Sequence, residues 1–396
     1  MKRLELIDGL RGYFLVFMLI NHLVFDGGYW LVEINHRQLA FVEDAQGFVF
    51  LSGLLVGMVY AGRMERRGFA PAARAIWRRT GDLYRQTLLL LALAMTMVLV
   101  FPAAQLAFAD WMGDLDWRNG FRAASAALLL FQPTYMDILP QYIVYMLAAP
   151  FLVHLCLKGR WGEVLIGSAL LWLAAQFAIQ RPFTAALNTW LAGDTGHGLR
   201  ANFNLMAWQI VFVSGLVFGV LSATNRVDWR RIFRPDRTLL PVAALAVCLF
   251  FLPFRFTTAY GYMPMDMLGT FQSYENRSEF GLVYLLNFAA AACGIAWLLI
   301  AGPRHASPRI RALANGLAGL VRLPFLRLLG RHSLQVYVWH VVIVYLVRFV
   351  DFETPMFSQA LKTAIALGCI ALLALPALYR ERDRYFGRAD PGTPSA

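Results

Sequence analysis

Long apolar stretches recur along the whole chain, and no other feature of the sequence constrains the fold more. About ten of them can cross a bilayer as α-helices, because a span needs roughly 20 predominantly apolar residues. They are expected at 9–26, 45–62, 83–101, 139–157, 163–180, 204–222, 239–254, 281–301, 332–349 and 359–379. Of the 396 residues, 59% are hydrophobic and only 15% are charged, which excludes a soluble domain. The sequence therefore predicts an all-α, polytopic membrane protein with about ten transmembrane helices.

Basic residues gather in alternate loops between these stretches. If the N-terminus is cytoplasmic, the arginine-rich loops 63–82, 226–237 and 304–331 all fall on the cytoplasmic side, and acidic residues dominate the opposite loops. This is the distribution of the positive-inside rule, so both termini are predicted to be cytoplasmic. The net charge of +12 is then explained by topology, and no nucleic acid partner is expected.

One apolar stretch, 122–135, is too short to span and ends in Gln132 and Pro133. Counting it as a span would invert every later loop, so a re-entrant or interfacial helix is expected there. Residues 1–386 are expected to form a single transmembrane domain, and 387–396 a disordered cytoplasmic tail. The four cysteines show neither metal-ligand nor disulfide spacing, so no metal site is expected.

The first predicted span carries two ionisable side chains. In IDGLRGYFLVFMLINHLVF, Arg11 and His22 lie within about 20° of one helix face and about 16 Å apart along its axis. Ionisable groups inside a membrane are costly and typically mark a functional interior. The pair predicts a fixed cation near one surface and a titratable base deep in the span. A snorkelling anchor and a hydrogen-bonded core histidine are the structural alternatives.

Further polar groups lie in or beside the second and third spans. Ser52 in FVFLSG suits helix packing or hydrogen bonding to a ligand better than nucleophilic catalysis, because no GxSxG elbow surrounds it. Arg78, Arg79 and Arg85 offer planar donors that suit phosphate or carboxylate groups. An ordinary basic interfacial loop also explains the first two of these arginines.

Three later segments add candidates. Asp137 and Tyr142 lie in PTYMDILPQYIV, where the carboxylate can orient a histidine, bind hydroxyl groups or simply cap a helix. In the sixth span, Trp208 and Gln209 suit a stacked sugar ring, although an interfacial tryptophan is also common as a membrane anchor. The ninth span has four polar residues in HSLQVYVWH that fit either a site or a polar core cluster: His332, Ser333, Tyr337 and His340.

The spacing from Arg11 to His22 resembles the first-helix R-x10-H motif of the membrane acyltransferase-3 superfamily. Within it, the chain is similar to the OpgC family, the succinyltransferases of osmoregulated periplasmic glucans. The likeness covers most of the chain and includes DGLRG, FVFLSG, PTYMDILPQYIV, FNLMAWQ and GRHSLQVYVWH. One departure is Gln46, which stands before FVFLSG where an acidic residue is expected.

The resemblance implies an acyltransferase of a bacterial inner (cytoplasmic) membrane. Its donor substrate would be acyl-CoA, namely succinyl-CoA, and its acceptor a hydroxyl of a periplasmic glucan. No tightly bound cofactor is expected, and the oligomeric state is left open. Carried over by motif position, the expected catalytic residues are His22, Arg11 and Asp137. The expected donor-binding residues are Arg78, Arg79, Arg85, Ser52, His332 and Ser333. The expected acceptor-binding residues are Tyr142, Trp208, Gln209, His340 and Tyr337.

A sugar hydroxyl is a poor nucleophile at neutral pH and needs a positioned base, a role that suits a neutral His22. Direct transfer in a pore joining both membrane faces is the expected mechanism, with a covalent acyl-histidine relay as the alternative. A transporter or flippase for a glycan or an acylated compound is the alternative function, since it would also use intramembrane charges and broken helices. A structural subunit would leave His22 unexplained.

Overall fold

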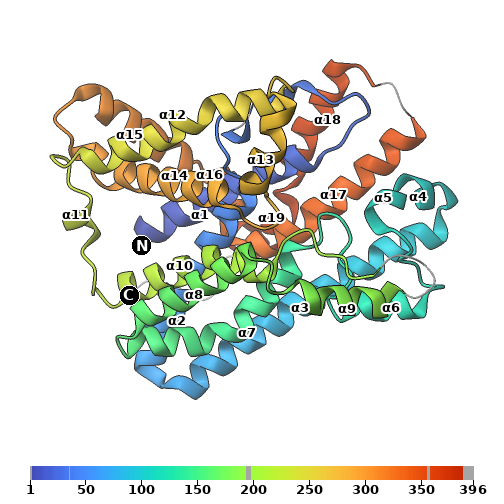
Figure 1. Cartoon of the computed structure of the whole chain (residues 1–396), viewed down its shortest axis with the longest axis horizontal. Helices are drawn as coiled ribbons and strands as arrows, with labels where there is room; N and C mark the ends of the chain where they lie inside the picture. The colour runs from blue at the N-terminus through green and yellow to red at the C-terminus, as the bar shows by residue number, and fades with distance from the viewer. Residues whose placement is uncertain (1, 35, 193–197, 355–356, 387–396) are drawn as a thin grey trace, which may run out of the picture.

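The fold is a bundle of α-helices (Figure 1). A computed structural model describes residues 2–34, 36–192, 198–354 and 357–386. In this part of the chain the single β-bridge joins Phe131 and Arg200. The long helices are α1 (Lys2–His22), α2 (Asp44–Arg67), α3 (Phe69–Val100), α7 (Ile138–Leu157), α8 (Trp161–Gln176), α10 (Leu205–Ala223), α12 (Leu239–Ala259), α14 (Leu282–Ile300) and α17 (Ser333–Glu353). Shorter helices are α4 (Pro102–Ala107), α5 (Ala109–Met112), α6 (Gly120–Ala127), α9 (Arg181–Ala192), α11 (Trp229–Ile232), α13 (Met265–Glu275), α15 (Pro308–Val321), α16 (Pro324–Arg331), α18 (Gln359–Leu372) and α19 (Leu375–Phe386).

Among the residues that the structure describes, eight helical segments are long and apolar enough to cross a membrane. They are α2, α3, α7, α10, α12, α14, α17 and the segment Gln359–Arg382, which joins α18 to α19. Two pairs, α8 with α9 and α15 with α16, pass the same test together but are bent by 64° and 54°. The count reaches ten if each pair is one span, so the expected polytopic all-α fold is confirmed.

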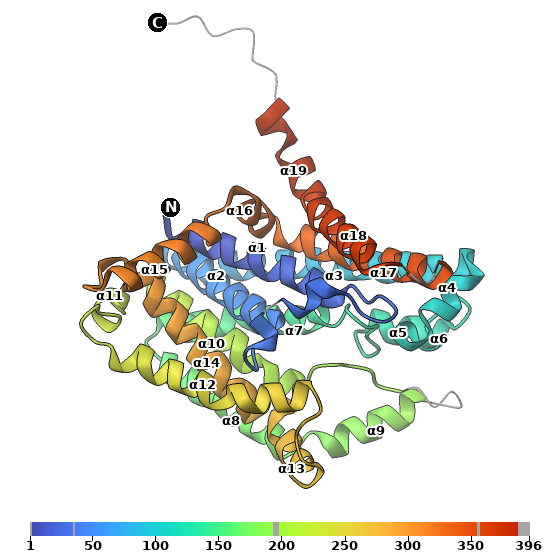
Figure 2. The ribbon, with the colours of Figure 1, turned by 90° about the horizontal axis from the view of Figure 1, so that it is seen from above.

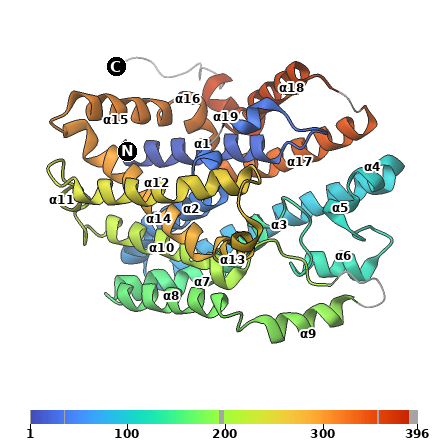
Figure 3. The ribbon, with the colours of Figure 1, turned by 45° about the horizontal axis from the view of Figure 1, so that its top comes forward.

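Two predicted boundaries change. The first apolar stretch was expected to span at 9–26, but α1 ends at His22 and is not among the segments that pass the test of length and apolarity, because Glu5, Asp8 and Arg11 lie within it. Segment 304–331 was expected to be a cytoplasmic loop, yet most of it forms α15 and α16, the bent pair that counts toward the ten in place of the expected first span. Figures 2 and 3 show α1 beside α2, with α12, α13 and α14 on one side and α17 and α18 on the other.

Glycines set the closest helix contacts. Gly53 and Gly57 of α2 face Gly215 and Gly219 of α10, and a Cβ at any of them would lie 2.1 or 2.2 Å from a backbone oxygen of the other helix. Small residues four apart allow such approach between membrane helices. Gly12 of α1 meets α16 in the same way, with a Cβ 1.9 Å from the Leu326 carbonyl. Gly53, the neighbour of Ser52, thus packs closely against α10.

The stretch expected to be re-entrant or interfacial forms the eight-residue helix α6 and then an irregular segment. Two non-glycine residues of that segment, Leu129 and Tyr135, have φ values of 65° and 68°, a region that L-residues rarely occupy. Hydroxyls of α17 hold the second bend: Tyr345 donates to the Thr134 carbonyl and Tyr337 to the Tyr135 carbonyl, at 3.1 and 3.0 Å. The segment thereby delivers the Tyr135 ring to the end of α1.

Candidate active site

His22 and His340 form the centre of the candidate site. Nδ1 of His22 lies 3.1 Å from Nε2 of His340, although 318 residues separate them in the chain. His340 lies in α17 and is fully buried, whereas His22 is partly exposed. Nδ1 of His340 is in turn hydrogen bonded to the Tyr337 carbonyl.

These contacts fix the tautomers of both neutral rings. A carbonyl only accepts, so Nδ1 of His340 carries the proton and Nε2 of His340 presents a lone pair. Nδ1–H of His22 therefore donates to that lone pair, because a hydrogen bond between two neutral imidazoles needs one donor and one acceptor. Nε2 of His22 is left with a free lone pair. The arrangement leaves His22 able to accept a proton.

The ring of Tyr135 holds the other side of His22. The two ring centroids are 4.2 Å apart at an interplanar angle of 31°, and Trp111 packs edge-on against Tyr135 at 5.0 Å. Sequence reasoning did not single out Tyr135. A backbone outlier next to a titratable side chain is typical of a functional site. The left-handed bend is what places this ring against His22.

Asp137 lies in the same region. It is 4% exposed, is hydrogen bonded by Asn202 and interacts electrostatically with Arg277. The neighbouring Tyr337 is 1% exposed, and its ring lies 4.7 Å from that of His340. The structure thus gathers His22, His340, Tyr337 and Asp137 around one segment.

A second group surrounds Arg11. Its guanidinium lies over the ring of Phe48, 5.4 Å from the centroid. Charges or dipoles of Tyr142, Asp8 and Arg79 act on it, and Tyr142 also interacts with Ser52. Asp8 interacts electrostatically with Arg11 and also with Arg327 and Arg331 of α16. Arg11, Arg79, Ser52 and Tyr142 therefore come together about 16 Å from His22 along α1.

The remaining expected site residues lie elsewhere. Arg78 and Arg85 are exposed, and the latter pairs with Asp82 at 3.7 Å. His332 lies 3.0 Å from Glu381 of α19, and the adjacent Ser333 is buried.

Two expected acceptor-binding residues have packing partners. The Trp208 indole is fully buried against Phe203 and Phe280, and its N–H donates to the Arg277 carbonyl at 3.1 Å. Gln209 is hydrogen bonded to Ser168 of α8 at 2.6 Å. A sugar ring stacked on Trp208 would require this packing to open.

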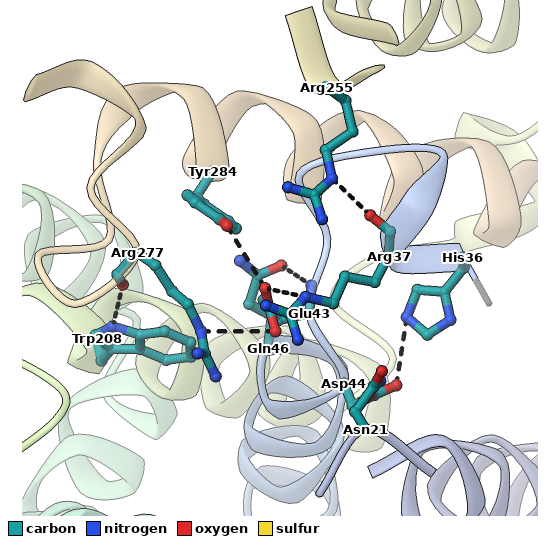
Figure 4. A network of polar contacts seen from close by, with 10 residues as sticks. All are labelled: Asn21, His36, Arg37, Glu43, Asp44, Gln46, Trp208, Arg255, Arg277 and Tyr284. Carbon is teal, nitrogen blue, oxygen red and sulfur yellow. Dashed lines mark hydrogen bonds and ion pairs between the residues drawn. The ribbon is translucent and has the colours of Figure 1, made fainter. Parts of the chain in front are cut away.

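A dense polar network near His22 was missed by sequence reasoning (Figure 4). Glu43 is 4% exposed and caps α2 together with Gln46, whose side chain accepts from the Glu43 amide at 3.1 Å. The Glu43 carboxylate lies 3.1 Å from Nε of Arg37 and 3.5 Å from Nε of Arg277. The acidic group expected at position 46 is thus supplied three residues earlier. The acidic pair Glu43 and Asp44, which directly precedes an apolar helix and follows Arg37 by six residues, was the available signal.

A branch of this network reaches the residue next to His22. Asn21 donates to Asp44 at 2.6 Å, and the other carboxylate oxygen of Asp44 lies 3.3 Å from Nε2 of His36. Nδ1 of His36 lies 3.2 Å from the Tyr13 hydroxyl. Burial is the main cause that lowers the pKa of His36, to about 4, so this imidazole is neutral at pH 7.

Burial and charge oppose each other in the rest of the network. Burial raises the pKa of Glu43, but Arg277, Arg37 and Arg255 lower it further, so the pKa lies below its ordinary value. Burial lowers the pKa of Arg277, whereas the Glu43 carboxylate raises it, and the pKa lies above its ordinary value. Both groups are therefore charged at neutral pH.

In the described segments, no group of three or more His, Cys, Asp and Glu residues is arranged to hold a metal ion.

A protein-family model described as OpgC protein matches residues 2–385, nearly the whole chain. No curated protein and no solved structure matches the chain.

Proposed function

The chain belongs to the OpgC protein family, and we propose that it is a membrane O-acyltransferase. In this proposal an acyl group, namely succinyl, moves from cytoplasmic acyl-CoA to a hydroxyl of a periplasmic glucan across a bacterial inner membrane. The family supports a role like that of a glucan succinyltransferase. The donor, the acceptor compartment and the histidine base are our own inferences.

The histidine pair is the observation that carries the mechanism. A general base must present a lone pair to the proton that it removes, and the tautomers leave that lone pair on Nε2 of His22. His340 acts as a positioning residue, because its acceptor nitrogen fixes the ring and tautomer of His22. It also stabilises the imidazolium that forms when His22 takes the proton.

The reaction balances through His22 alone. The glucan hydroxyl oxygen attacks the thioester carbon while Nε2 of His22 takes the hydroxyl proton. The carbon–sulfur bond then breaks, and the imidazolium returns the proton to the CoA thiolate. The products are a glucan ester and free CoA. The group around Arg11 suits the phosphates or the polar arm of the donor, because guanidinium groups remain charged and bind anions in two-point contacts.

The first test is transfer of labelled succinyl from succinyl-CoA to glucan by the purified protein in lipid nanodiscs. Replacing His22 with Gln removes the base, and turnover should fall by about 10²–10⁴-fold. His340→Gln retains an acceptor oxygen and should lose much less activity than His340→Phe, which retains none. His305→Gln is the matched control, since His305 follows α14 and contacts Ser307 and Trp297.

Two outcomes would contradict the proposal. Normal turnover by His22→Gln would remove the histidine base. Movement of glucan or of an acylated compound across the membrane with no new ester would favour a transporter or flippase instead.

A further inference from the structure

Arg277 lies in the short segment between α13 and α14. Its ion pair with Glu43 joins it to the polar network that continues through Asp44 to Asn21, the residue beside His22. The charge of Arg277 acts on His22, Tyr135 and Asp137. Its carbonyl accepts from Trp208, which anchors the backbone to α10. The position is therefore fixed by buried partners even though the residue lies outside the regular helices.

The guanidinium of Arg277 is held in one orientation, and some of its N–H donors are left for a ligand. Nε lies 3.5 Å from Glu43, and the group sits 5.3 Å from the centroid of the Phe203 ring. Figure 4 shows the two terminal nitrogens pointing away from Glu43. Within the described residues no hydrogen bond or ion pair involves these nitrogens, and the side chain is 41% exposed. Four N–H donors are thus available to a ligand.

This inference rests on the proposed function. The length of the acyl group limits which cation can bind its free carboxylate. In a succinyl thioester, two methylenes separate the reacting carbonyl from the free carboxylate, a distance of about 4 Å when extended. Arg11 lies about 16 Å from His22 along α1, far beyond this reach. Arg85 is exposed and paired with Asp82. Neither cation suggested by the sequence suits a carboxylate whose thioester lies at His22.

We propose that the terminal nitrogens of Arg277 bind the free carboxylate of a dicarboxylic acyl group while its thioester lies at His22. Glu43 holds Nε and so presents the outer edge of the guanidinium, the edge that makes two parallel hydrogen bonds to a carboxylate. Arg277 is then the residue that selects a succinyl donor over a neutral donor of the same length.

The test compares succinyl-CoA with butyryl-CoA, which has four acyl carbons and no free carboxylate. Arg277→Gln should lower kcat/KM for succinyl-CoA by about 10- to 100-fold and leave butyryl-CoA unchanged. Arg277→Lys keeps the charge and should recover part of the loss. Arg255→Gln is the matched control: Arg255 belongs to the same network, and its Nε donates to the Arg37 carbonyl at 2.8 Å. It should change both donors equally.

Equal loss with both donors in Arg277→Gln would overturn the proposal, and so would a wild-type enzyme that does not distinguish them. Binding of the two CoA thioesters to the His22→Gln protein, measured by calorimetry, provides a readout without turnover. Absence of any acyl transfer would refute the proposed function. In that case the binding measurement still decides on the carboxylate site. Tighter binding of succinyl-CoA than of butyryl-CoA that Arg277→Gln abolishes would support the site, and equal binding of the two thioesters would refute it.

Discussion

At the scale of single residues, the strained backbone at Tyr135 matters most for the site. A non-glycine residue with φ of 68° persists because Tyr337 and Tyr345 bind the carbonyls on either side. The bend holds an aromatic ring against His22, in addition to the hydrogen bond between His22 and His340. The cost in backbone energy is thus linked to the orientation of the proposed base.

Replacing Tyr135 with Gly separates these two effects. Glycine adopts positive φ freely, so the bend itself is kept and the melting temperature should fall only through the lost packing of the ring against His22 and Trp111. Succinyl transfer should fall by about tenfold or more, because the stacked ring no longer orients His22. Leu129→Gly is the control, because Leu129 has nearly the same φ and lies away from His22 in sequence. Melting and turnover are measured on the same samples. An unchanged rate in Tyr135→Gly would show that the ring does not orient His22.

At the scale of elements, the close crossing of α2 and α10 positions residues of the candidate site. Four glycines bring the two backbones together, and α2 carries both Ser52 and the residues that follow Glu43. The first turn of α10 also contacts Arg277, because the Trp208 indole N–H donates to the Arg277 carbonyl. A change in this crossing would therefore move both Glu43 and Arg277 of the polar network.

Gly57→Leu should therefore destabilise the protein. Its side chain would meet the Leu216 carbonyl, since even a Cβ would lie 2.1 Å from that oxygen, and overpacking of this kind costs about 1–3 kcal/mol or more. Gly167→Leu on α8 is the control, because a Cβ there meets no atom within 4 Å. Thermal unfolding in detergent measures both. Similar melting temperatures for the two variants would argue against the close crossing.

At the scale of the whole molecule, the charge pattern predicts the orientation in the membrane. Loop 226–237 has five arginines and should face the cytoplasm, whereas the segment after α5 contains Asp114 and Asp116 and should face the opposite side. The proposed chemistry needs this orientation, because acyl-CoA is cytoplasmic and the glucan is not.

Cysteine labelling tests the orientation. In a variant without the four native cysteines, Arg118→Cys should react with a membrane-impermeant maleimide in cells whose outer membrane is permeable. Arg230→Cys should react only after the inner membrane is lysed. Both side chains are exposed, so access to the reagent depends on the membrane side. The reverse pattern would invert the topology and place the acyl donor on the wrong side.

Sequence reasoning reached Arg11, His22 and His340 because each is a polar residue in an apolar helix, which local context reveals. It missed Arg277 and Glu43, which lie in short segments at helix ends where charged residues are ordinary. It also expected Trp208 near a surface, but three aromatic and backbone partners from other segments bury it. Burial depends on neighbours distant in the chain, and no local pattern specifies them.

The sequence by itself determined that this protein lies in a membrane as a set of helices, because apolar length and loop charge are properties of each segment alone. Only the tertiary structure decided which polar groups meet. His22 and His340 come from opposite ends of the chain, and the tautomer that frees Nε2 exists only once the Tyr337 carbonyl is in place. The physical reason is that hydrogen bonds act over about 3 Å and therefore depend on how the helices pack.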